Sequence, residues 1–78
     1  MKARIFVTLK DGVLDPQGLA IQGALGSLGF KGLQSVRQGK IFDIELADGL
    51  GAETQLKSMC EKLLANSVIE DFRVELRD

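Results

Sequence analysis

One stretch of the sequence combines residue types that often carry chemistry. Residues 59–72 read MCEKLLANSVIEDF and contain the only cysteine, Cys60, and the only asparagine, Asn66. A cysteine becomes a nucleophile when a neighbouring base or cation lowers its pKa. The chain has no histidine, so neither a cysteine–histidine nor a serine–histidine pair can form. Cys60 also falls on the apolar stripe of a predicted helix, which indicates a packed side chain and not a reactive one.

Other patterns that bind ligands are incomplete. The glycine-rich GSLGFKG lacks the lysine followed by serine or threonine of a phosphate-binding loop. The usual zinc ligand sets are missing because the chain has no histidine and one cysteine. A single cysteine also cannot form an internal disulfide. No carboxylate pair has the helical spacing of a magnesium site. RNA recognition by a sheet needs exposed aromatic side chains, whereas this chain has four phenylalanines and most of them are predicted to point inward. The sequence therefore predicts no catalytic, cofactor-binding or metal-binding residue.

The length and charge of the chain further limit the class of protein and its possible partners. Seventy-eight residues correspond to a single domain, 1–78, which buries only about 60–65% of its unfolded surface and therefore favours self-association or a bound partner. Ten basic against eleven acidic residues disfavour nucleic acid as a partner. No signal peptide and no apolar run long enough to span a membrane are visible, so a cytoplasmic protein is expected.

The first third of the chain predicts a strand and a helix. In KARIFVTLK, alternation places Ala3, Ile5 and Val7 on one face, with Arg4 and Phe6 on the other. Next, Asp15-Pro16 reads as a helix N-cap followed by proline at the first helical position, and Gly29 reads as the C-terminal stop. The predicted helix between them carries an apolar stripe formed by Ala20, Ile21, Ala24, Leu25 and Leu28.

Three glycines lie in this helix, opposite the apolar stripe: Gly18, Gly23 and Gly26. Each costs about 1 kcal/mol relative to alanine in a helix interior. Two interpretations stay open. The glycines face solvent, or they allow another backbone to approach closely.

The rest of the chain predicts a hairpin, a helix and a strand. Gln38-Gly39 forms the predicted turn between a short strand around Val36 and a strand that directs Phe42 inward together with Ile44 and Leu46. The loop ADGLGAE follows. A helix from about Ala52 to Ala65 ends at Asn66, which tolerates the left-handed conformation. Its apolar stripe is Ala52, Leu56, Met59, Cys60 and Leu63, with Leu64 at the edge. A last strand from about Val68 directs Phe72, Val74 and Leu76 inward.

This order, β-α-β-β-α-β, predicts an α+β, ferredoxin-like two-layer sandwich with both helices on one face of an antiparallel sheet. The other face carries Arg4, Phe6, Ile41 and Arg73 among mixed charges. It is the natural surface for sheet-to-sheet dimerisation, although antiparallel sheets often leave one face in water.

Three ordered motifs carry a resemblance that covers nearly the whole chain: VLDPQG (13–18), VRQGK (36–40) and CEKLLANSVIEDF (60–72). With them, the chain resembles the PurS family, the small subunits of phosphoribosylformylglycinamidine (FGAM) synthase. It departs from the family pattern at Ser67, often proline, at Phe72, often tyrosine, and at Gly23 and Gly26, where larger residues are common.

The resemblance implies a noncatalytic role in purine biosynthesis. Such a subunit self-associates, as a homodimer or dimer of dimers, and bridges a PurL-like synthetase and a PurQ-like glutaminase so that ammonia passes between them. ATP and magnesium are then expected on the synthetase and not on this chain. The alternative, by fold analogy alone, is a regulatory module that senses a small metabolite at a dimer interface.

The candidate contact residues come from the sheet face and from the matching motifs. Arg37 and Lys40 place two positive charges at the tip of the predicted hairpin, where an acidic partner surface or solvent can face them. The full set of candidates for partner or subunit contacts is Arg4, Phe6, Arg37, Lys40, Ile41, Asn66, Glu70 and Arg73.

Overall fold

The computed structural model of the chain describes residues 1–47 and 51–77. Within these residues the elements are, in order, β1 (Lys2–Leu9), α1 (Pro16–Ser27), β2 (Gly39–Glu45), α2 (Ala52–Met59), η1 (Cys60–Leu64) and β3 (Glu70–Arg77). The element η1 is a π-helical turn that directly continues α2. The loop predicted at ADGLGAE falls partly on residues 48–50, which lie outside the described residues.

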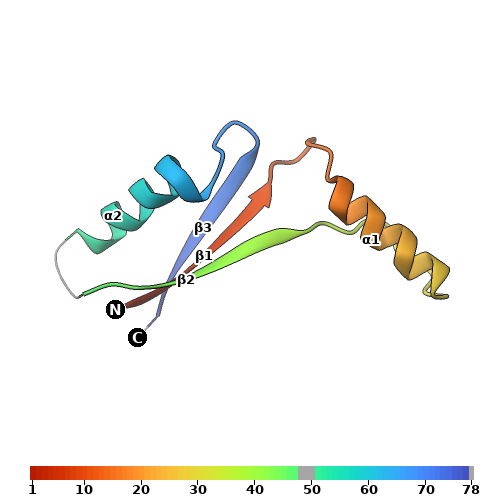
Figure 1. The fold of residues 1–78 in the computed structure, drawn as a ribbon, viewed down its shortest axis with the longest axis horizontal. Coiled ribbons are helices and arrows are strands. Elements are labelled where there is room, and N and C mark those ends of the chain that lie inside the picture. Colours follow the sequence, from red (N-terminus) through yellow and green to blue (C-terminus); the bar gives the residue numbers. More distant parts are fainter. Residues whose placement is uncertain (48–50, 78) are drawn as a thin grey trace.

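β1 is the central strand of an antiparallel sheet with the order β2-β1-β3 (Figure 1). The predicted alternation of β1 is confirmed, because Ala3, Ile5 and Val7 are all buried. Ile5 lies opposite Phe42 on β2 and Val74 on β3, so the three strands bring their apolar side chains to one face, called the inner face here. The ferredoxin-like α+β class predicted from the sequence is confirmed.

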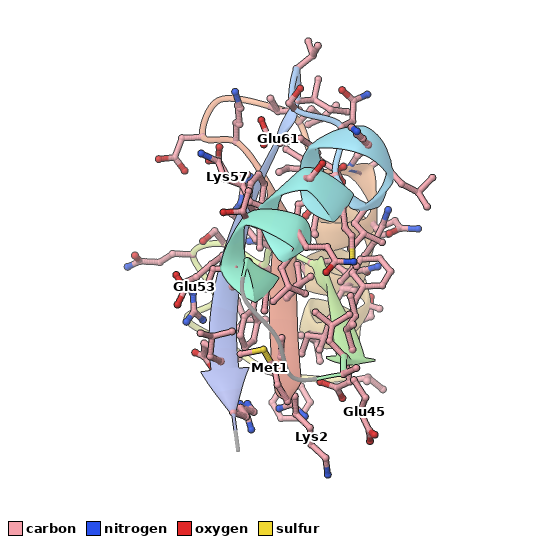
Figure 2. All side chains as sticks on the ribbon, turned by 90° about the vertical axis from the view of Figure 1, so that its left-hand side faces the viewer. Met1, Lys2, Glu45, Glu53, Lys57 and Glu61 are labelled. Carbon is pink, nitrogen blue, oxygen red and sulfur yellow. The ribbon has the colours of Figure 1, made fainter. Side chains whose placement is uncertain are left out.

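The second helix covers the inner face. Leu56 and Cys60 are fully buried against β1, and Glu53 and Lys57 lie on the solvent side of the same helix (Figure 2). The helix itself, predicted for 52–65, is confirmed. The predicted burial of one residue of the apolar stripe is wrong, because Leu63 is 83% exposed.

The π-helical turn explains where Leu63 points. The Ala65 N–H donates to the Cys60 carbonyl at 2.9 Å, an i→i+5 bond that widens the turn relative to an α-helix. The side chains that follow Cys60 are therefore rotated from their α-helical positions. Leu64 packs against the core in place of Leu63.

α1 begins and ends as predicted. The Asp15 side chain caps its first turn, Pro16 is the first helical residue, and Gly29 follows the helix with a φ of 98°. The prediction that both helices cover the sheet is wrong, because α1 extends beyond the end of the sheet (Figure 1). Its apolar side chains Leu19 and Ile21 are consequently exposed.

The predicted hairpin is also wrong, since residues 30–38 form no strand and β2 starts at Gly39. The segment 28–38 instead returns along α1: Gln22 Nε2 donates to the Leu33 carbonyl at 3.3 Å, and Gln38 Nε2 donates to Gln17 Oε1 at 2.6 Å. These contacts between residues far apart in sequence replace the local turn. We call residues 16–38, α1 with its return segment, the arm.

The joint between η1 and β3 differs from the prediction in detail. Asn66 does not take the left-handed conformation; it organises a turn in which its Oδ1 accepts from the Val68 N–H at 3.1 Å. Its carbonyl also accepts from the N–H groups of Ile69 and Glu70. The last strand therefore begins at Glu70, two residues after the predicted Val68.

Candidate functional site

The eight predicted contact residues separate into two groups in the structure. The outer-face group lies on the sheet face opposite α2, where Phe6 is in register with Ile41 on one side and Arg73 on the other, and Arg4 lies next along the same strand. The sheet-end group lies where β1 ends and β3 begins. Its members are Arg37, Lys40, Asn66 and Glu70.

Paired charges dominate the outer-face group. Arg4 binds Asp43 across the strands with two hydrogen bonds, Nε to Oδ1 at 2.8 Å and Nη2 to Oδ2 at 3.3 Å. The Arg4 guanidinium holds the pKa of the Asp43 carboxyl below its usual value of 3.8. A fork-like pair of this kind is geometrically rigid, so it fixes the shape of the surface around it.

Arg73 forms the other half of the outer-face group. Its guanidinium carbon lies 4.2 Å from the centre of the Phe6 ring, and it also donates to Glu75. Hydrogen bonds from Arg73 and then Arg77 lower the pKa of Glu75. Ile41 lies among these charged side chains and is exposed, so the outer face also carries an apolar side chain. Strand alternation in the sequence already places Asp43 and Glu75 on this face, but the predicted contact residues did not include them.

The sheet-end group does not form a charged hairpin tip, which corrects the prediction for Arg37 and Lys40. Arg37 Nη2 donates to the carbonyls of Leu9 at 2.9 Å and Lys10 at 3.1 Å. Lys40 Nζ lies 4.0 Å from Glu70 Oε2, and the other Glu70 oxygen accepts from the Asn66 N–H at 2.7 Å. These groups serve the fold where the arm meets the sheet.

Asp15, at the same end of the sheet, has a larger role than the helix cap that the sequence predicts. Its buried carboxylate accepts from Gly18 N–H and from Gln38 N–H, each at 2.8 Å. The Gln38 bond, and then the Gly18 bond, lower the pKa of Asp15 below its usual 3.8. The Asp-Pro pair predicts the cap; nothing local predicts the bond to Gln38, 23 residues away.

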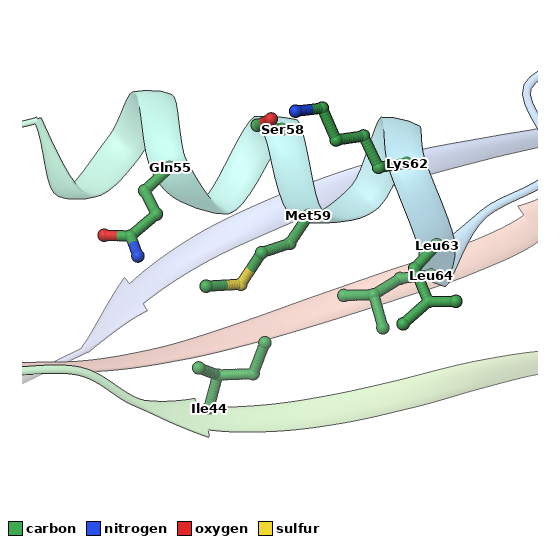
Figure 3. A pocket seen from close by; sticks show the side chains of 7 residues that line it. All are labelled: Ile44, Gln55, Ser58, Met59, Lys62, Leu63 and Leu64. Carbon is green, nitrogen blue, oxygen red and sulfur yellow. The ribbon is translucent and has the colours of Figure 1, made fainter.

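Two of the hollows on the surface adjoin these elements. One, of about 330 Å³, is at the sheet end between Asp15, Gln38, Lys40 and Glu70. The other, of about 370 Å³, is an open apolar groove between α2–η1 and β2 (Figure 3). We call it the groove; its lining residues are Ile44, Gln55, Ser58, Met59, Lys62, Leu63 and Leu64.

The chemistry of the described residues is limited. Cys60 is fully buried as predicted, and burial first, then the nearby Glu61 carboxylate, raises the pKa of its thiol. Within residues 1–47 and 51–77, no three side chains of the metal-binding types gather into a group that could hold an ion. In the same part of the chain, no helix has the length and apolarity needed to cross a membrane.

The three-stranded antiparallel sheet and its covering helix define a small ferredoxin-like α+β domain. The chain belongs to the PurS family. The family model described as "PurS: Phosphoribosylformylglycinamidine (FGAM) synthase" matches residues 2–78. The phosphoribosylformylglycinamidine synthase subunit PurS of Bacillus subtilis is 48% identical over 79 residues, covering 99% of this chain and 93% of that protein.

Solved structures agree with this assignment. The structure of B. subtilis PurS in a C2 crystal form superposes with a TM-score of 0.91 at 45% identity, covering 99% of this chain and 98% of that one. A chain in the structure of PurLQS from Thermotoga maritima has a TM-score of 0.69 at 28% identity, with coverage of 95% and 93%. The extended placement of α1 is thus part of a fold that other members of the family share.

Proposed function

We propose that this chain is the noncatalytic small subunit of a glutamine-dependent FGAM synthase. The observation that carries the proposal is the family match over residues 2–78, supported by relatives whose names give them as subunits of this synthase. The buried Cys60 is consistent with a subunit whose partners perform the chemistry. The complex would convert formylglycinamide ribonucleotide to FGAM with ATP and glutamine in purine biosynthesis, in the cytoplasm.

The partners follow from the same family. The T. maritima relative is found in a structure of PurLQS, which supports a PurL-like synthetase and a PurQ-like glutaminase as partners of this chain. The chain would bridge the two, so that ammonia released by the glutaminase reaches the synthetase without escaping to solvent. ATP and magnesium would bind to the synthetase. Self-association of the chain accompanies this role.

The outer-face group is the proposed contact surface for one of these partners. Arg4 and Arg73 are held in fixed positions by Asp43, Glu75 and the Phe6 ring, so little side-chain freedom is lost on binding. Arginine and aromatic side chains are also the residue types that dominate the centres of protein interfaces.

Reconstitution tests the function. The purified chain is mixed with its synthetase and glutaminase, and FGAM formation is measured with glutamine and, separately, with ammonia as nitrogen donor. Omitting the chain should abolish or strongly reduce the glutamine-dependent reaction. Arg73→Ala should weaken it, whereas Lys57→Ala, on the solvent side of α2, should not. Full activity with both donors in the absence of the chain would refute the proposal.

A further inference from the structure

The hollow at the sheet end, called the sheet-end hollow here, is lined by charged and amide side chains from distant parts of the sequence. It has a volume of about 330 Å³ and lies between the start of α1, the end of the return segment and the first residues of β2 and β3. Small-molecule sites in proteins have volumes of about 300–1,000 Å³. The sheet-end hollow is at the lower end of that range, which suits a ligand of the size of a free amino acid.

Glu70 supplies a fixed negative charge in the sheet-end hollow. Its side chain is only 14% exposed, and one carboxylate oxygen accepts from the Asn66 N–H at 2.7 Å. The other oxygen lies 4.0 Å from Lys40 Nζ, which is longer than the distance of about 2.7–2.9 Å typical of a charge-assisted hydrogen bond. The backbone therefore sets the position of the carboxylate, while its second oxygen can accept a hydrogen bond from the ammonium group of a ligand.

Lys40 supplies the opposite charge on a more exposed side chain. Its side chain is 63% exposed, and its pair with Glu70 is loose at 4.0 Å, whereas Arg4 and Asp43 on the outer face are 2.8 Å apart. A solvent-accessible ion pair contributes little to folding, so a ligand can separate its two members at small cost. A ligand that carries both an ammonium and a carboxylate group would replace one long contact with two short ones.

Two glutamine side chains provide amide groups beside these charges. Gln38 Nε2 donates to Gln17 Oε1 at 2.6 Å, which leaves Gln17 Nε2 as a donor and Gln38 Oε1 as an acceptor for a ligand. A primary amide carries two donor hydrogens and one acceptor oxygen, so it can bind to both groups. Val7 and Leu9 also line the hollow and add apolar surface for methylene groups.

We propose that the sheet-end hollow binds a free α-amino acid with a side-chain amide, of which L-glutamine is the probe used below. Glu70 accepts from the ligand ammonium, and Lys40 donates to the ligand carboxylate. The two glutamine side chains bind the amide. Because Gln38 belongs to the arm and Glu70 to the sheet, the ligand joins these two parts beside the bond between Asp15 and Gln38. This site goes beyond the proposed function and does not depend on it.

Isothermal titration calorimetry of the chain with L-glutamine tests the site. The full chain is used in the association state that it has in solution, and binding should saturate at one ligand per chain. Two analogues test which charges the hollow recognises: glutaramate lacks the α-ammonium group, and γ-aminobutyramide lacks the α-carboxylate. Each should bind roughly tenfold or more weakly than L-glutamine, because each loses one charge-assisted contact.

Two variants remove one charge each from the hollow. Lys40→Met removes the ammonium group, and Glu70→Gln removes the charge but keeps an oxygen that can accept from the Asn66 N–H. Each should weaken L-glutamine binding roughly tenfold or more. γ-Aminobutyramide should bind equally to the wild type and to Lys40→Met, since it lacks the group that Lys40 contacts. Lys57→Met and Glu53→Gln, at exposed positions of α2, are the matched controls and should bind L-glutamine as the wild type does. Far-ultraviolet circular dichroism verifies that each variant is folded.

Three results would overturn the site: no saturable binding of L-glutamine, analogues that bind as tightly as L-glutamine, or charge-removing variants that bind it no more weakly than the controls do. The proposed function is judged separately by reconstitution. A chain that binds L-glutamine but fails to support the glutamine-dependent reaction would refute the function and leave the site standing. A chain that supports the reaction but binds no L-glutamine would do the reverse.

Discussion

The two halves of the molecule use similar side chains in opposite environments. Beneath α2, Ile5, Leu56 and Cys60 are completely buried. On the arm, Leu28 and Phe30 are mostly exposed to solvent. Apolar burial stabilises the first half within one chain, at roughly 25 cal/mol per Å². The contrast shows that the apolar character of a residue in this small fold does not by itself predict that the chain buries it.

The halves also differ in what holds them in place. The inner face is held by side-chain packing, whereas the arm is attached by hydrogen bonds: Asp15 accepts from the Gln38 N–H, and Arg37 donates to the Leu9 carbonyl. A hydrogen bond specifies direction more than packing does, because it weakens steeply when its angle changes. The polar junction therefore sets where the arm points, and the apolar surfaces determine what it can meet there.

The largest expected effect comes from truncating the core. Leu56→Ala should lower the free energy of unfolding by about 2–5 kcal/mol, because it leaves a cavity beneath α2. Leu19→Ala on the arm should cost less than about 0.5 kcal/mol at low protein concentration. Urea unfolding of the two variants measures both values. Equal losses in dilute solution would mean that the arm is packed within its own chain.

The next largest effect on stability is expected from substituting two glycines of α1, which should respond in opposite directions. Gly18→Ala should destabilise the fold by about 1–3 kcal/mol, because the new methyl group overlaps the Val36 carbonyl. Gly23→Ala meets nothing within 4 Å and should stabilise the chain by about 0.4–1 kcal/mol. Thermal unfolding distinguishes the pair. A neutral Gly18→Ala would show that the arm is not held against its return segment.

The acid dependence of the junction gives a third test. The hydrogen bonds from Gln38 and Gly18 hold the pKa of Asp15 below its unfolded value of 3.8, so the folded chain binds fewer protons there. This stabilisation is complete above about pH 5, where the carboxyl is ionised in both states, and is lost as the pH falls through the lowered pKa. Asp15→Asn should reduce the melting temperature at neutral pH by roughly 4–8 °C, since one amide oxygen replaces two acceptors.

The same variant should be less sensitive to acid than the wild type. Between about pH 5 and pH 2.5, its melting temperature should fall less steeply, because the titrating group has been removed. Asp11→Asn, in the exposed turn before the junction, is the control and should follow the wild type. Parallel curves for wild type and Asp15→Asn would exclude Asp15 as an acid-sensitive contact.

The smallest stability effect is expected on the outer face. Arg4→Gln removes the paired bonds to Asp43, but exposed ion pairs contribute little to folding and are screened by salt. The melting temperature should change less than for Leu56→Ala, Gly18→Ala or Asp15→Asn, and the difference should shrink further in about 1 M salt. A large loss would show that the outer face contributes to the fold and is not only a surface for partners.

The sequence predicted those features whose causes lie within a few residues. The alternation of β1, the Asp15-Pro16 start of α1, the Gly29 stop and the burial of Leu56 and Cys60 are all correct. It also brought the residues of the outer-face group together, because strand alternation assigns each residue a face. Leu63 was misplaced because a π-helical turn leaves no clear mark in an apolar stripe.

Local patterns were thus sufficient for both helices, for three of the four predicted strands and for the family. They could not decide where α1 lies, because an apolar stripe indicates that a helix has a face to cover and does not specify which surface covers it. Nor could they show that Asp15, beyond capping its helix, binds Gln38 and directs the arm outward. Those decisions depend on contacts between residues far apart in sequence, and only the folded chain brings them together.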